Sequence, residues 1–141
     1  MRIKDKQPAR KSQHIPSDHM ATLDLDTIHF SFKYLDLTNT HFSINQRTSK
    51  YFEKIIARLK ELCTLKAKEI YANRSRALRA HPIQWKETTQ PKGFIHLNEQ
   101  LQQIPPYQFQ ISTNEHGRVH GFFISNIFFI VWFDPDHKLY L

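Results

Sequence analysis

The pattern of apolar and polar positions is clearest in the last third of the chain, where it predicts three successive β-strands. Residues 107–111, 117–124 and 127–133 are rich in β-branched and aromatic side chains, and short polar connections separate them. The third run is apolar at every position, which predicts an interior strand covered on both faces. Such a strand needs a second layer of structure, which the rest of the chain must supply.

Two further patterns upstream predict that layer and a first strand. Residues 28–37 alternate between apolar and polar side chains, as a half-buried strand does. A stripe of apolar residues, spaced three and four apart, then predicts an amphipathic helix that Ser49 caps. The stripe consists of Phe52, Ile55, Ile56, Leu59, Leu62 and Cys63. Cys63 is expected to be buried as a small hydrophobe. A second helical turn over residues 65–71 either forms a separate helix or continues the first as one bent helix.

The periodicity disappears between residues 73 and 106, so this segment is expected to be a long loop. Loops of this length are unusual in a compact domain and are often functional. Whether the loop covers the second face of the sheet stays open. The element order predicts an α+β fold with two layers, in which one or two N-terminal helices pack on a four-stranded, mainly antiparallel sheet (β-α-α-β-β-β). Residues 26–141 would form this single domain, and residues 1–25 a flexible basic tail.

Composition and charge narrow the class of partner. The chain has 141 residues with 40% hydrophobic and 13% aromatic residues, which fits one globular domain. No apolar run reaches the roughly 20 residues that a membrane helix needs, and the basic N-terminus lacks the hydrophobic region of a secretory signal. A soluble, cytoplasmic protein with no membrane partner is therefore expected. The formal net charge of +7 favours a polyanionic partner, with nucleic acid first.

The positive charge is concentrated in the helical middle of the chain rather than in the strands. Residues expected to contact a nucleic-acid backbone are Lys50, Lys54, Arg58, Arg74, Arg76, Arg79 and, near the C-terminus, Lys138. The alternative is a basic helix face whose only role is to be solvated.

Polar residues near the start of the 117–124 strand are the best candidates for chemistry. Because alternate residues of a strand share a face, His116, Arg118 and His120 are expected to project together. A guanidinium binds phosphate oxygens and an imidazole transfers protons near neutral pH, so this set suits a phosphodiester substrate. As alternatives, Arg118 braces the strand through Asp134 or Asp136, and His120 is a structural histidine. No third ligand accompanies the two histidines, so no metal site is expected.

The element order and two local segments resemble the RelE/ParE-like superfamily of small bacterial toxins over about residues 27–141. The segments are residues 114–121 (Asn-Glu-His-Gly-Arg-Val-His-Gly) and residues 134–140 (Asp-Pro-Asp-His-Lys-Leu-Tyr). In ribonuclease members of that superfamily, an arginine near the start of the penultimate strand meets a histidine or tyrosine at the C-terminus. Arg118 and the pair His137 and Tyr140 occupy the corresponding places here. Two residues separate this pair, whereas some members place the histidine and tyrosine side by side.

The resemblance implies a toxin-type, metal-independent endoribonuclease that cleaves mRNA with or without the ribosome, uses no cofactor and has an antitoxin protein as partner. RNA cleavage needs a base, charge stabilisation at phosphorus and an acid. We assign charge stabilisation to Arg118, the acid to His137, the base to His120 or Glu115, and substrate positioning to Tyr140. Alternatively, His137 and Tyr140 only dock the tail. The protein would then be a non-catalytic basic binder, either a ParE-like inhibitor of a protein target or a nucleic-acid-binding accessory module, or an antitoxin-neutralised scaffold without activity.

Overall fold

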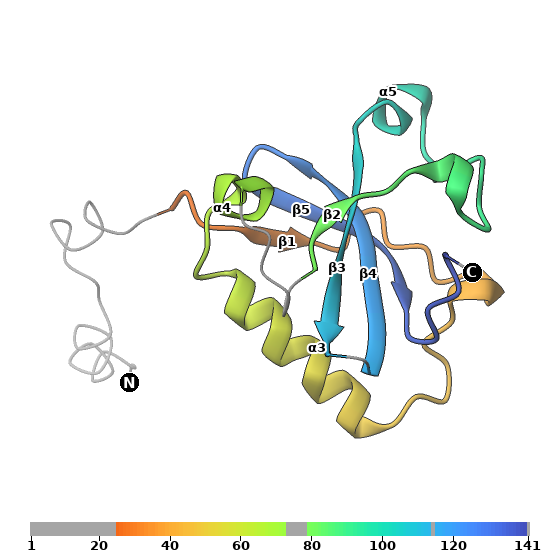
Figure 1. Ribbon diagram of the computed structural model, residues 1–141, viewed down its shortest axis with the longest axis horizontal. Helices are drawn as coiled ribbons and strands as arrows, with labels where there is room; N and C mark the ends of the chain where they lie inside the picture. Colours follow the sequence, from red (N-terminus) through yellow and green to blue (C-terminus); the bar gives the residue numbers. More distant parts are fainter. Residues whose placement is uncertain (1–24, 73–78, 114, 141) are drawn as a thin grey trace, which may run out of the picture.

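The computed structural model describes residues 25–72, 79–113 and 115–140, and its centre is a five-stranded sheet in the order β1-β5-β4-β3-β2 (Figure 1). The strands are β1 (His29–Ser31), β2 (His81–Pro82), β3 (Pro106–Ser112), β4 (Glu115–Ile124) and β5 (Ile127–Asp134). β3, β4 and β5 form an antiparallel meander, β1 pairs with β5 in parallel and β2 pairs with β3 antiparallel. The predicted α+β fold and its three C-terminal strands are confirmed. The predicted count of four strands is wrong, because the expected loop contributes β2.

A β-bulge in β5 decides which face each of its last residues occupies. Trp132 pairs with His120 of β4, whereas Ile130 pairs with the very next residue of β4, so Val131 is the extra residue. Val131 and Trp132 consequently both pack on the same face of the sheet. The alternation resumes one residue out of phase, and Asp134 reaches the face that carries His120.

Helices α3 (Ser49–Leu62) and α4 (Ala67–Ala72) cover one face of the sheet (Figure 1). Of the two arrangements left open by the sequence, the helical pair is the one observed. The core on this side combines helix residues with the inward residues of β3, β4 and β5: Tyr51, Ile55, Leu59, Leu62, Ile70, Phe109, Val119 and Phe128. A turn at residues 63–66 separates the helices, and the carboxylate of Glu69 accepts a hydrogen bond from the Lys66 amide there.

The buried stripe of α3 differs from the predicted one. Thr48 rather than Ser49 caps the helix, since its side chain accepts from the Tyr51 amide. Tyr51 packs against the sheet, so the buried face of the helix is rotated relative to the predicted one. Three residues that were predicted to be buried are therefore exposed: Phe52, Ile56 and Cys63. The alternating pattern of residues 28–37 also predicted a longer first strand than the structure has. β1 has three residues, and the chain turns after it with Phe32 exposed.

The second face of the sheet is covered by segments without strong periodicity. They include η2 (Thr40–Phe42), η3 (Trp85–Glu87), α5 (Glu99–Gln102) and the C-terminal tail after β5. The core on this side contains Phe42, Ile83, Phe94, Leu97, Phe122, Val131, Trp132 and Leu139. The segment after residue 79 is therefore the second covering layer, although its sequence resembles a loop.

Some predicted features lie outside the described residues, including most of the 1–25 tail and both Arg74 and Arg76. Within the described ranges, no helix is both long and apolar enough to cross a membrane.

Candidate active site

A pocket of about 370 Å³ lies on the sheet face opposite α3 and α4. The residues that line it come from β2 and the segment after it, from β3 and β4, and from the end of β5 and the tail: His81, Pro82, Gln84, Glu87, Gln108, Arg118, Asp134, His137, Leu139 and Tyr140. Arg118, His137 and Tyr140, which the sequence analysis placed in one site, are all among them. The structure therefore brings these three residues to one cavity.

The buried carboxylate of Asp134 holds the tail in place over the sheet. Its Oδ1 accepts a hydrogen bond from the Lys138 amide at 2.8 Å, and its Oδ2 accepts one from the Leu139 amide at 3.0 Å. The tail turns tightly enough to place His137 in the left-handed region, with a φ of 56°. Asp134 thereby fixes the loop that carries His137 and the irregular segment that leads to Tyr140.

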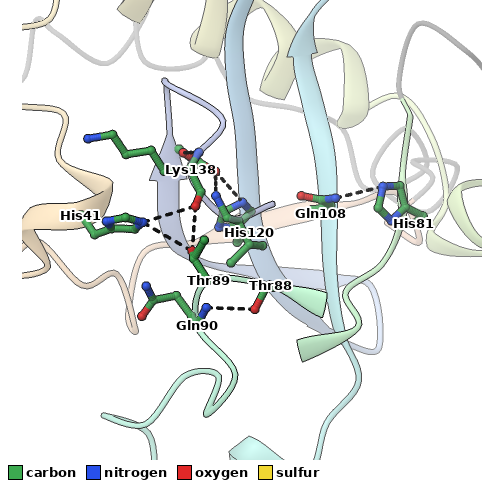
Figure 2. A network of polar contacts seen from close by, with 10 residues as sticks. His41, His81, Thr88, Thr89, Gln90, Gln108, His120 and Lys138 are labelled. Carbon is green, nitrogen blue, oxygen red and sulfur yellow. Dashed lines mark hydrogen bonds and ion pairs between the residues drawn. The ribbon is translucent and has the colours of Figure 1, made fainter. Parts of the chain in front are cut away.

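Other contacts hold the far side of the tail. The Thr89 hydroxyl donates to the Lys138 carbonyl at 2.7 Å, and the Thr89 amide donates to the Leu139 carbonyl at the same distance. The His41 ring also lies against the Lys138 carbonyl (Figure 2). The Tyr140 hydroxyl accepts from the Gln84 amide at 3.1 Å. The tail is thus tied to the segment between β2 and α5, and together they form the walls of the pocket.

Arg118 supplies the positive charge of the pocket. Its side chain is half-buried, and Nη1 donates to the amide oxygen of Gln110 at 3.1 Å. Burial lowers the pKa of Arg118, the charge of Arg79 lowers it further, and Asp134 opposes this. The guanidinium remains charged, because its ordinary pKa is far above neutrality. A guanidinium in the pocket lining, with a second one near enough to lower its pKa, favours an anionic ligand there.

Burial determines the protonation state of His120, one of the two residues predicted from the sequence as the general base. His120 is fully enclosed, with its ring against those of Phe42 and Trp132, and its Nε2 lies 3.4 Å from Asp134 Oδ2. Burial lowers the pKa of His120, an effect that Asp134 opposes and Arg118 reinforces. Burial raises the pKa of Asp134, but His120 and the two tail amides outweigh it, so that this pKa is lowered overall. A neutral imidazole beside a carboxylate is the result, out of reach of a substrate.

This arrangement predicts how stability depends on pH. Because the pKa of His120 is lower in the folded protein than its ordinary 6.5, the unfolded chain binds a proton more readily. The contribution of His120 to the free energy of unfolding is complete above pH 6.5. It is lost as the pH falls below this value, by at most about 1.4 kcal/mol per pH unit. Urea unfolding at pH 7.5 and pH 5.5 measures this loss, and a His120→Leu variant should show a smaller one. An equal loss in both proteins would contradict the prediction.

Glu115, the second predicted candidate for the base, and its neighbour His116 lie outside the pocket lining. Glu115 is exposed at the beginning of β4. His116 was expected to share a face with Arg118, but it lies on the helix side against the ring of Tyr51, with Nδ1 2.8 Å from Ser112 Oγ. The alternation fails here because His116 and Gly117 both have positive φ, 63° and 73°. A Cβ on Gly117 would lie 1.8 Å from the carbonyl oxygen of Asp134, so only glycine allows this close approach.

The predicted nucleic-acid contacts are divided between the two sides of the molecule. Lys50, Lys54 and Arg58 belong to α3, which covers the face opposite the pocket. The Arg58 side chain is largely covered and donates to the Ile111 carbonyl and to Glu61. By contrast, Arg79 lies close enough to Arg118 to affect its pKa, and Lys138 belongs to the tail beside the pocket. Only these last two are near the candidate site among the described members of the set.

Sequence patterns did not predict several residues that line the pocket, notably His81, Glu87 and Gln108. His81 and Glu87 lie in the segment that was expected to be a loop, and Gln108 is a polar residue within an apolar strand. Their meeting depends on the pairing of β2 with β3, for which the two-residue β2 leaves no periodic signal. No group of three or more His, Cys, Asp or Glu side chains in the described part of the chain gathers to hold a metal ion.

Comparison of the chain with known protein families, with curated proteins and with solved structures finds no match.

Proposed function

We propose that the protein is a metal-independent endoribonuclease of toxin type and that the pocket around Arg118 is its active site. The observation that carries the proposal is the meeting of Arg118, His137 and Tyr140 in one cavity. The resemblance of the C-terminal segments to RelE/ParE-like toxins, in which an arginine meets a C-terminal histidine or tyrosine, supports the same conclusion. mRNA, free or on the ribosome, is the proposed substrate, and an antitoxin protein is the proposed partner.

The chemistry assigned to these groups is cleavage by the neighbouring 2′-hydroxyl. The 2′-oxygen forms a bond to phosphorus and the bond from phosphorus to the 5′-oxygen breaks, which leaves a 2′,3′-cyclic phosphate and a free 5′-hydroxyl. Arg118 binds the phosphate oxygens, on which negative charge increases in the transition state. His137, in its protonated form, gives a proton to the departing 5′-oxygen. Tyr140 forms one wall and positions the phosphate or the nucleotide.

Incubation of the purified protein with RNA in EDTA tests the proposal. We expect strand cleavage in the presence of the chelator, and we expect cyclic phosphate ends on the upstream products. A substrate with a 2′-deoxynucleotide at the main cleavage site should stay intact at that position, since the attacking oxygen is missing. Because the activity is proposed with or without ribosomes, the assay is run with free RNA and with translating ribosomes. Intact RNA in both would contradict the proposal.

A second candidate function, binding to a protein target without catalysis, is favoured by one specific observation. Phe52 and Ile56 of α3 expose apolar side chains side by side, at 39% and 64% of their surface, although the helix is otherwise well packed. Exposed apolar groups of this kind often mark a contact surface. If binding causes growth arrest when the protein is induced alone, Ile56→Asp should relieve the arrest and Arg118→Ala should not. The ribonuclease proposal requires Arg118→Ala to relieve it.

A further inference from the structure

We propose that His81 is the general base of the pocket and that Gln108 is the residue that positions it. This inference rests on the proposed ribonuclease function. It fills a role that the structure leaves open, because His120 is enclosed and Glu115 lies outside the pocket lining. His81, in contrast, lines the pocket from β2 and is exposed.

The hydrogen bonds of His81 indicate which of its ring nitrogens is basic. Nδ1 lies 2.9 Å from the carbonyl oxygen of Pro82, which can only accept, so Nδ1 carries the proton. Nε2 lies 2.9 Å from Nε2 of Gln108, whose amide donates to it (Figure 2). The imidazole is then neutral, with its lone pair on Nε2. A general base must begin the reaction in this state.

Gln108 has the properties of a residue that holds a catalytic histidine. It sits directly opposite His81 in the β2–β3 pair and opposite His120 in the β3–β4 pair. Its side chain is only 2% exposed, so packing holds it beside His81. Its Oε1 has no hydrogen-bond partner among the described residues. A rotation of the amide by half a turn would offer this oxygen to a protonated Nε2, so Gln108 can bind His81 before and after proton uptake.

The proposed step conserves atoms and charge. The hydrogen bond from the Gln108 amide to Nε2 of His81 must first break, because it occupies the lone pair of Nε2. Nε2 then accepts the proton of the 2′-hydroxyl while the 2′-oxygen forms its bond to phosphorus. The bond to the 5′-oxygen breaks, and that oxygen takes a proton from His137. His81 ends protonated and His137 neutral, and both return to their first states by exchange with solvent. The other ionisable groups that line the pocket around His81 are Glu87, Arg118, Asp134 and Tyr140.

A substrate with an altered leaving group separates the base from the acid. In one RNA, sulfur replaces the departing 5′-oxygen at the main cleavage site, so that the leaving group needs no proton. On ordinary RNA, His81→Ala and His137→Ala should each lower the cleavage rate by about 100- to 10,000-fold. On the sulfur RNA, His137→Ala should regain most of the wild-type rate and His81→Ala should not. His29→Ala, a histidine on the opposite edge strand β1, is the control and should match the wild type.

The outcomes distinguish the two proposals. If the wild type cleaves but His81→Ala is as active as His29→Ala, His81 is not the base and the ribonuclease proposal stands. Recovery of His81→Ala on the sulfur RNA would show that it acts as the acid instead. If Glu87→Gln, and not His81→Ala, lowered the cleavage rate on both the ordinary and the sulfur RNA, Glu87 would be the base. If the wild type cleaves neither RNA, the function itself fails, and the assignment of a base fails with it.

A measurement without substrate tests the geometry separately. Nitrogen chemical shifts of the His81 ring should show a neutral imidazole protonated at Nδ1 at pH 8. Gln108→Glu should raise the pKa of His81 relative to the wild type, because a carboxylate favours the imidazolium form. Gln108→Leu, which fills similar space without polar atoms, should not raise it. An imidazole protonated at Nε2, or a pKa that is the same in all three proteins, would overturn the proposed pairing.

Discussion

Replacing Arg118 by alanine is expected to lower the rate of RNA cleavage by about 100- to 1,000-fold. The guanidinium is the charged donor of the pocket on the sheet face, and it is held in place by the Gln110 amide at 3.1 Å. Its loss removes the group that neutralises charge on the phosphate oxygens when that charge is greatest. Single-turnover cleavage of a short RNA measures the effect, since binding and chemistry can then be separated.

Two further variants define what this result means. Arg118→Lys keeps the charge but loses the planar pair of donors, so it should recover only part of the activity. Lys33→Ala removes an exposed cation that follows β1, at the far edge of the sheet, and should cleave RNA at the wild-type rate. Circular dichroism and thermal unfolding should show all three proteins folded. If Arg118→Ala cleaved RNA at the wild-type rate, Arg118 would have no catalytic role and the proposed active site would be wrong.

Replacing Asp134 by alanine is expected to destabilise the folded protein by about 2–6 kcal/mol. Its carboxylate accepts from the Lys138 and Leu139 amides and lies beside His120, in a position that is 1% exposed. Each buried donor left without a partner costs about 1–3 kcal/mol. Urea unfolding at neutral pH measures the loss. The tail should also be digested faster by a carboxypeptidase, because the amide contacts that hold it are gone.

Asp136 provides a matched control for this change. It is the same residue type two positions along the chain, but it is exposed and its carboxylate is paired with Arg47. Exposed ion pairs contribute about 0–1 kcal/mol, so Asp136→Ala should be nearly as stable as the wild type. Equal losses in the two variants would mean that the tail is held by its apolar contacts rather than by the buried carboxylate.

The convergence of Arg118 with the tail was predictable from the strand pattern, whereas the rest of the pocket was not. A two-residue connection at Ser125 and Asn126 sets the register of the last two strands. The start of β4 must then lie beside the end of β5, where Arg118 pairs with Asp134. The tail that follows Asp134 can therefore be expected near Arg118. This inference needs only the hairpin.

The parts that sequence patterns could not predict depend on contacts between distant segments. Apolar spacing predicted α3 but not its rotation, because Tyr51 and Phe52 are equally suitable as core residues until the sheet is placed against them. The ring of Phe42, which belongs to η2, lies against His120, and the segment after β2 and the tail cover other parts of the second face. None of these segments has a periodic pattern. His81 reaches the pocket through a pairing of two residues with β3, too short to be seen in the sequence.

The bulge at Val131 makes the site sensitive to the length of one strand. If β5 kept its length but lost the bulge, every side chain after Val131 would change faces and Asp134 would turn toward the helices. Its charge would then enter the apolar core, and the amides of the tail would have no acceptor. Loss of the Val131 codon, by contrast, removes only the extra residue and leaves Ile130 and Trp132 opposite Gly121 and His120, so it should be tolerated far better than an insertion into the regular part of the strand.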